Sequence, residues 1–221
     1  MGRGQGKLVT IVGSAYCQPI ADLLDRALTD KRPRPNKIQS GFYENGYATS
    51  VVLLLVALFE SYVSRLRFVQ RDKVPVTARS AVDVVLAVYP RMRHIKALTD
   101  VYILRDLLIH NHLWEIDYEW GGAPSMVLRG ATKDPAYGDR KYINRVNAAT
   151  RRTKALGLTV LPSRVDRTDV LKVFDTIWKT LLIFEGSDRF QCYVSHEHVR
   201  FRGKTVLFSM LRDYIAATTK L

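Results

Sequence analysis

The sequence predicts a mainly α-helical bundle with small β-hairpin additions. Apolar residues recur at helical spacing over most of the chain, including the long stretch 48–69 with its uninterrupted apolar run Val51–Phe59. Strand-like alternation of apolar and polar residues is confined to short segments near 113–128 and 192–201. At 221 residues, with 47% hydrophobic and 25% charged residues, the chain is long enough to bury one good core.

We therefore expect a single domain over residues 1–221. Its core helices would lie within about 18–112 and 168–186. Residues 113–167 would form a basic insertion, and residues 187–221 would form a C-terminal appendage.

Charge and cysteine usage bound the function. The net charge of +13 implies an anionic partner, and nucleic acid is the first candidate. Cys17 and Cys192 lie far apart without a metal-binding spacing, which fits free thiols in a reducing cytoplasm. No secretory signal is evident, and the run Val51–Phe59 is shorter than the span of about 20 residues that a bilayer requires. We therefore expect a cytoplasmic protein with no membrane partner.

Three helices are expected before the central motif. Residues 18–29 form an amphipathic pattern. Residues 48–69 form the longest helix, and its apolar middle would lie at the centre of a bundle or at a subunit interface. Residues 77–89 follow, with Thr77 as the N-cap and Pro90 as the stop.

The next helix carries the residues with the strongest chemical signal. Thr99 or Asp100 is expected to cap it, and Arg105, Asp106 and His110 lie near its end. Asp106 and His110 are four residues apart on one helix face, so the carboxylate could hydrogen-bond the imidazole and favour its protonated form. Arg105 lies roughly 140° around the helix from His110, but its long side chain could reach a phosphate held there. The alternative is a histidine that only complements the helix dipole.

The pattern Arg105-x4-His110, with polar Asp106 directly after the arginine, resembles the Arg-x4-6-His motif of the HEPN superfamily. The stretch 45–67 is similar to the long early helix of that superfamily, with Glu60 as its embedded polar residue.

This resemblance implies a HEPN-like helical bundle, often dimeric. It also implies a metal-independent ribonuclease of the kinds found in toxin–antitoxin, abortive-infection and phage-defence systems, with an antitoxin or activator protein as a further partner. One toxin subgroup carries a tyrosine, modified by a partner nucleotidyltransferase, where this chain has His112. The chain departs from that subgroup, so that form of control is not implied.

Cleaving RNA through its own 2′-hydroxyl requires a base, an acid and a cation for the phosphorane charge. His110 would act on the 2′-oxygen or the leaving 5′-oxygen, Arg105 would hold the phosphate, and Asp106 or Glu60 would orient them. Two chains meeting at a two-fold axis would supply both proton carriers, so we expect a homodimer. The alternative for Glu60 is a place in solvent, because polar residues follow it.

A basic segment follows the motif. Residues 129–167 hold ten Lys or Arg and three acidic residues, which predicts a loop with one short helix and a shallow RNA-binding surface. The alternative is a solvated basic face. Before it, residues 113–120 and 126–128 are expected to pair, with aromatic side chains that either cover the bundle or stack on bases. The predicted RNA-binding residues are Asn111, His112, Arg140, Lys141, Arg145, Arg151, Arg152 and Lys154.

The C-terminal part is expected to contain two further helices. Thr168 or Asp169 would cap a helix that stops at Gly186. The last helix would run over about 206–217, after a strand-like segment and a turn at Gly203.

The remaining histidines give no site. His94 is expected at the surface, and His196 and His198 lack a third ligand with metal-binding spacing. We therefore expect neither a metal ion nor another cofactor.

Two functions fit these observations. The first is a metal-independent endoribonuclease of the HEPN type, a toxin or anti-phage defence effector that cleaves RNA through a composite dimer site. The alternative is a non-catalytic HEPN-type module that binds RNA or a partner protein, because a net charge of +13 serves binding equally well.

Overall fold

The computed structural model describes residues 12–29, 44–109, 144–147, 149–186 and 193–219, together with the backbone of the strands at 114–118 and 126–131. These residues form a mainly helical fold, as the sequence predicts. The α-helices within them are α1 (Cys17–Thr29), α2 (Glu44–Val69), α3 (Ala81–Val88), α4 (Ile95–Ile109), α6 (Arg167–Glu185) and α7 (Leu211–Thr219). The described strands form antiparallel pairs: β1 (Trp114–Tyr118) with β2 (Met126–Ala131), β3 (Val146–Asn147) with β4 (Arg152–Thr153), and β5 (His198–Phe201) with β6 (Lys204–Leu207).

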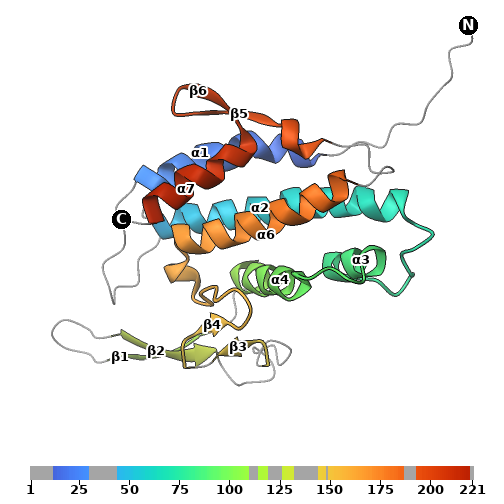
Figure 1. The fold of residues 1–221 in the computed structure, drawn as a ribbon. Helices are drawn as coiled ribbons and strands as arrows, with labels where there is room; N and C mark the ends of the chain where they lie inside the picture. Colours follow the sequence, from blue (N-terminus) through green and yellow to red (C-terminus); the bar gives the residue numbers. More distant parts are fainter. Residues whose placement is uncertain are drawn as a thin grey trace, which may run out of the picture.

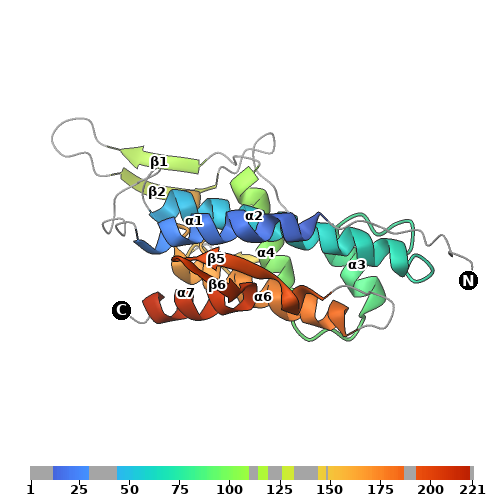
Figure 2. The same cartoon turned by 90° about the horizontal axis from the view of Figure 1, so that it is seen from above.

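The helices stack in three layers (Figure 1). The helices α2 and α6 lie side by side in the middle layer and contact each other. The helices α1 and α7 cover one face of this layer, and α3 and α4 lie against the other. Figure 2, taken with Figure 1, shows that α4 crosses α2 and α6 instead of running alongside them. The β5–β6 hairpin packs on α1.

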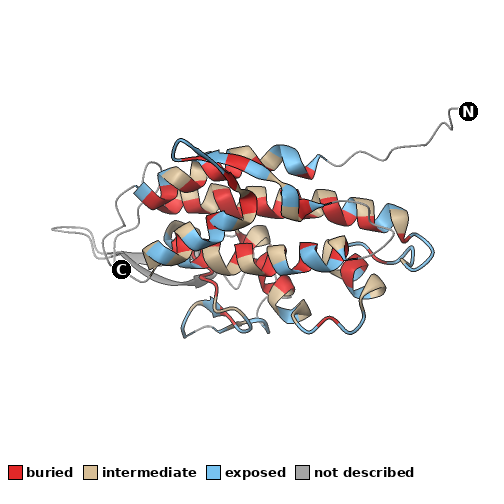
Figure 3. Cartoon of the chain, turned by 45° about the horizontal axis from the view of Figure 1, so that its top comes forward, coloured by how far each residue is buried: buried red, intermediate tan, exposed pale blue. Residues whose placement is uncertain are grey.

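The apolar middle of α2 lies at the centre of the core, which is one of the two placements that its sequence predicts. Buried residues face the spaces between the layers, and exposed residues face outwards (Figure 3). Within the predicted apolar run, Val51, Val52, Leu58 and Phe59 are fully buried at 0% exposure. Helix α2 contacts α1, α3, α4 and α6, so the protein itself covers its apolar surface.

By length and composition alone, α2 is also the one described helix that could cross a membrane. Half of its most apolar 18-residue window is buried inside the protein, and the core helix of a soluble protein meets the same criterion. This window is longer than the uninterrupted run Val51–Phe59 and contains no more than two charged residues.

Residues 193–219 are part of the main core and not the expected appendage. Strand β5 turns alternate residues onto α1, and α7 packs on α6. The buried residues of this part that join the main hydrophobic cluster are Val194, Val199, Phe201, Val206, Phe208, Leu211 and Ile215. Leu158 and Val165 join the same cluster from within the expected insertion 113–167, so that segment also contributes to the core.

The hairpin prediction for 113–128 is confirmed by the β1–β2 pair, in which Trp114 lies opposite Ala131 and a register shift separates Glu115 from Ile116. The predicted start of a helix near Val206 is wrong, because that residue belongs to β6. The turn between β5 and β6 has positive φ at Arg202 (49°) and Gly203 (75°), as a tight two-residue hairpin turn requires.

The start of α3 differs from the prediction. The helix begins at Ala81 instead of near Thr77, because Ser80 and Asp83 form a capping box. The Ser80 hydroxyl accepts the Asp83 N–H at 3.1 Å, and the Asp83 carboxylate accepts the Ser80 N–H at 2.9 Å. The helix ends at Val88, before Pro90, as predicted.

A buried ion pair joins the N-terminal ends of α2 and α6. Glu44 is 1% exposed, and its carboxylate accepts hydrogen bonds from Arg167 Nε at 2.7 Å and Nη2 at 2.9 Å. It also accepts the Arg167 backbone N–H at 2.9 Å. Arg167 Nη2 donates further to the carbonyl oxygen of Ala27, near the end of α1. Three helices are therefore fixed to one another at this end of the bundle.

A second buried acid holds the start of α6. Asp166, and not the predicted Thr168 or Asp169, is the N-cap, and Asp169 completes a capping box with it. Asp169 is 2% exposed and also accepts the Thr159 N–H at 3.1 Å. Burial, followed by the negative charge of Asp166, raises the pKa of Asp169 to about 6.

We expect Glu44→Gln to lower the free energy of unfolding by about 3 to 5 kcal/mol, because it leaves the Arg167 guanidinium buried beside a neutral amide. Urea denaturation measures the change. The matched control is Asp25→Asn, which breaks the exposed Asp25–Arg202 pair at 2.8 Å and should cost less than about 1 kcal/mol. Equal losses in the two variants would show that the buried Glu44–Arg167 pair contributes no more to stability than an exposed ion pair.

We expect the contribution of Asp169 to stability to fall as pH rises. The native state holds the Asp169 proton more tightly than the unfolded chain, in which an aspartate has a pKa of about 3.9. This contribution is therefore complete below about pH 4 and is lost as the pH rises through about 6. Between pH 4 and 7, the free energy of unfolding of the wild type minus that of Asp169→Asn should drop by about 2 to 3 kcal/mol in urea denaturation. A difference that does not change with pH would contradict this prediction.

Candidate functional site

Three of the four predicted catalytic residues lie together where α4 crosses α2. Arg105, on α4, donates from Nη1 to Asp106 Oδ1 at 2.7 Å and from Nη2 to Glu60 Oε1 at 3.3 Å. The contact between Glu60 and Arg105 joins residues 45 positions apart in the chain. Of the two placements considered for Glu60, the structure therefore supports a contact with the motif, although 40% of its side chain remains exposed.

The two carboxylates keep Arg105 charged. Burial by itself lowers the pKa of Arg105, but the hydrogen bond to Asp106 and the negative charges of Glu60 and Asp106 outweigh it and raise the pKa above its ordinary value. The guanidinium uses two of its five N–H groups on these partners, which leaves donors for an anion. The arrangement can therefore present a fixed cation to a phosphate.

The described part of α4 ends at Ile109, directly before His110 in the sequence. His110 lies outside the described residues, and so does its predicted contact with Asp106. The predicted RNA-binding residues Asn111, His112, Arg140 and Lys141 also lie outside them. The assignments of these residues stay predictions.

Arg105 borders a groove with a volume of about 1100 Å³. The groove is lined by the start of α3, by one face of α4 and by residues 144, 145, 154 and 155 of the basic segment. Glu60, Arg105 and Asp106 all line it. The site therefore lies on a concave surface that could hold a ligand larger than a single phosphate.

The predicted RNA-binding surface divides into two parts. Arg145 and Lys154 are exposed and line the groove. Arg151 and Arg152 do not line it. Arg152 donates to the carbonyl oxygen of Gly157 at 2.8 Å, and Arg151 has a φ of 52°, so both help to shape the turn that carries them.

Asp100 fixes the basic segment to α4. The prediction that Thr99 or Asp100 caps this helix is wrong, because α4 already begins at Ile95. Asp100 is 3% exposed, and its Oδ2 accepts the N–H groups of Ala155 at 2.8 Å and Leu156 at 2.7 Å. A buried carboxylate without such donors would be strongly destabilising. Its side chain therefore makes a tertiary contact with the backbone of the basic segment and holds residues 154–156 beside the groove.

Tyr102 is a residue of the groove that the sequence analysis did not identify. It lies three residues before Arg105 on α4 and packs edge-on against Phe59, with the ring centroids 6.4 Å apart. Its hydroxyl is buried and has no hydrogen-bond partner within the part of the chain that the structure describes. Burial, followed by the negative charge of Glu60, raises its pKa well above the ordinary value, so the phenol remains protonated.

Among the described residues, the other titratable side chains do not form a second centre. His94, expected at the surface, is partly buried and shares a 2.9 Å hydrogen bond with Thr180, and burial followed by the charge of Lys179 lowers its pKa. Cys17 is a free thiol whose pKa burial raises to about 12, whereas Cys192 lies outside the described residues. Among the described residues no three His, Cys, Asp or Glu are grouped to hold a metal ion. That chemistry proceeds without metal stays a prediction.

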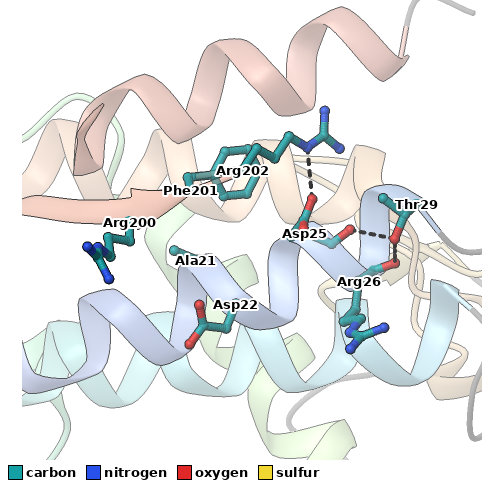
Figure 4. Close-up of a pocket in the computed structure, with 8 residues that line it drawn as sticks. All are labelled: Ala21, Asp22, Asp25, Arg26, Thr29, Arg200, Phe201 and Arg202. Atoms are coloured by element: carbon teal, nitrogen blue, oxygen red, sulfur yellow. Dashed lines mark hydrogen bonds and ion pairs between the residues drawn. The ribbon is translucent and has the colours of Figure 1, made fainter. Parts of the chain in front are cut away.

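A different pocket, of about 560 Å³, lies between α1 and β5 (Figure 4). Its walls carry charges of both signs, and Asp25 pairs with Arg202 across it at 2.8 Å. None of the predicted site residues lines this pocket.

Comparison of the chain with models of known protein families, with curated proteins and with solved structures gives no match. The resemblance to the HEPN superfamily therefore rests on the Arg105-x4-His110 motif and on the helix that carries Glu60, and it stays a prediction.

We expect Tyr102→Phe to raise the free energy of unfolding by up to about 1 kcal/mol, because it keeps the ring and removes a buried hydroxyl that has no partner among the described residues. Urea denaturation measures the change. The control Tyr193→Phe removes a hydroxyl from a residue that is 64% exposed, and it should change the stability by less than about 0.5 kcal/mol. A loss of stability in Tyr102→Phe would show that the hydroxyl has a partner in the folded protein.

Proposed function

We propose that the chain is a metal-independent endoribonuclease of the HEPN type, which acts in the cytoplasm as a toxin or anti-phage defence effector. The observation that best supports this proposal is Arg105, which is held by Glu60 and Asp106 in the wall of a groove. It lies on the last turns of α4, five residues before His110.

The proposed reaction uses the 2′-hydroxyl of RNA as its nucleophile. The 2′-oxygen attacks the adjacent phosphorus as a base removes its proton, and the bond from phosphorus to the 5′-oxygen breaks as an acid protonates that oxygen. His110 carries one of these protons, and Arg105 neutralises the phosphorane oxygens. The products are a 2′,3′-cyclic phosphate and a free 5′-hydroxyl.

One histidine cannot be the base and the acid of the same step. In the proposed site, a second chain supplies the second His110 across a two-fold axis, and the protein acts as a homodimer. Glu60 and Asp106 are positioning residues, because both bind the guanidinium of Arg105. An incoming phosphate would compete with them for Arg105, which binds anions through several N–H donors at once.

We expect His110→Ala and Arg105→Ala each to lower the rate of RNA cleavage by about 100-fold or more, because each removes a proton carrier or the cation of the transition state. The assay uses purified protein, end-labelled RNA and an excess of EDTA. The matched controls are His198→Ala and Arg200→Ala, which remove exposed residues of the same types from β5, on the opposite side of the helical layers from α4 (Figure 1). These controls should cleave at the rate of the wild type.

The product ends and the substrate range complete the test. Cleavage should persist in EDTA, leave DNA intact and yield 2′,3′-cyclic phosphate ends. If 5′-phosphate ends appear, and only with Mg²⁺, the proposed mechanism is wrong. A wild-type protein that binds RNA but never cleaves it would instead support the alternative of a non-catalytic RNA-binding module.

A further inference from the structure

The groove beside Arg105 carries four further cations, of which two were not among the predicted RNA-binding residues. Arg79 precedes the cap of α3, Lys96 lies on the first turn of α4, and Arg145 and Lys154 lie on the basic segment. All four residues are exposed. Within the described residues, none of their side chains forms an ion pair with an acid, so their charges remain available to a ligand.

The acids of the groove are engaged by the protein itself. Asp83 accepts the N–H groups of Ser80 and Arg79, and these bonds lower its pKa. Asp100 accepts two backbone N–H groups of the basic segment. Glu60 and Asp106 are paired with Arg105. The groove therefore offers unpaired cations to a ligand, while its carboxylates are directed at donors of the protein.

The shape and the walls of the groove favour one kind of anion. Cations from three parts of the chain surround it, as a backbone with several phosphates requires. Its volume of about 1100 Å³ is large enough for a few nucleotides of a single strand. The exposed Leu86 and the partly exposed Val82 and Tyr102 line it and can contact bases. Proteins that bind single strands combine a basic groove with such surfaces.

We propose that single-stranded RNA occupies this groove, with Arg79, Lys96, Arg145 and Lys154 neutralising phosphates on either side of the one that Arg105 holds. The order of phosphates along the groove rests on the proposed function, because that function assigns the scissile phosphate to Arg105. Binding of the strand itself rests only on the groove and its cations.

The test reverses the two cations that lie outside the basic segment. In Arg79→Glu/Lys96→Glu, both new acids lie at the starts of helices, where negative charge suits the helix dipole, so the fold should be retained. The matched control is Arg200→Glu/Lys204→Glu, which changes the net charge equally on the β5–β6 hairpin, on the opposite side of the helical layers (Figure 1). Circular dichroism and thermal melting check both proteins.

The probe is a fluorescein-labelled 20-nucleotide RNA with 2′-O-methyl groups throughout, which the proposed chemistry cannot cleave. Fluorescence anisotropy should show an affinity at least about tenfold weaker in Arg79→Glu/Lys96→Glu at moderate salt. The slope of log affinity against log salt should also fall by about 1.4, the equivalent of two phosphate contacts on a single strand. The control variant should stay within about twofold of the wild type with an unchanged slope. With cleavable RNA, KM should rise while kcat is retained.

Several results would overturn the inference. Equal weakening in both double variants would show only an effect of overall charge, and wild-type binding in the groove variant would place the RNA elsewhere. Equal or tighter binding of a labelled RNA duplex would identify a different occupant. If Arg79→Glu/Lys96→Glu fails to fold, Arg145→Glu/Lys154→Glu replaces it with the same expected result.

The inference and the proposed function fail separately. If His110→Ala still cleaves RNA while the groove variant loses binding, the proposed mechanism is wrong and the groove stands. If His110→Ala and Arg105→Ala are inactive while the groove variant binds and cleaves normally, the function stands and the groove is not the path of the RNA.

Discussion

The buried pair of Glu44 and Arg167 is the contact on which the arrangement of the helices depends. The three hydrogen bonds between them oppose rotation of α2 against α6, because a rotation would leave a charge buried without a partner. Glu60 lies sixteen residues further along α2, roughly 160° around the helix from Glu44. Fixing one face of α2 on α6 therefore turns the other towards α4, where Glu60 meets Arg105. The position of Glu60 in the candidate site therefore depends on the contact that Glu44 makes at the start of α2.

The sequence predicts the parts of this fold that depend on local pattern. Apolar periodicity gave α1, most of α2 and α6 with ends close to those observed, and the alternation after the motif gave the β1–β2 pair. Residues whose type fits two structural roles were assigned to the wrong one. Asp100 is of a residue type that often caps helices, but its carboxylate is buried against the backbone of residues 155 and 156. Val206 continues an apolar pattern that fits a helix, yet it pairs with Val199 in a hairpin. Such choices depend on partners that are distant in the chain.

The same limit applies to the candidate site. Arg105 and Asp106 are adjacent, so their pairing needs only a local helix, whereas the contact with Glu60 could be anticipated only from a family resemblance. Arg79 and Lys96 meet the basic segment through the crossing of α4 over the middle layer, and no sequence pattern specifies that crossing. The sequence also gives no sign that the Tyr102 hydroxyl lacks a partner among the described residues, because a tyrosine at a helical apolar position is an ordinary core residue.

The contact made by Asp100 has a consequence for how this protein can change. Among the described residues, Asp100 accepts peptide N–H groups and binds no side chain of the basic segment, so this contact does not depend on which non-proline residues stand at 155 and 156. Residues 145 and 154 can thus be exchanged without loosening the scaffold, and each exchange would alter the charge or shape presented beside Arg105. The backbone N–H groups of the segment anchor it, and its side chains at 145 and 154 line the groove. Single substitutions at these positions can therefore change ligand preference without moving the helical bundle or the Arg105 guanidinium.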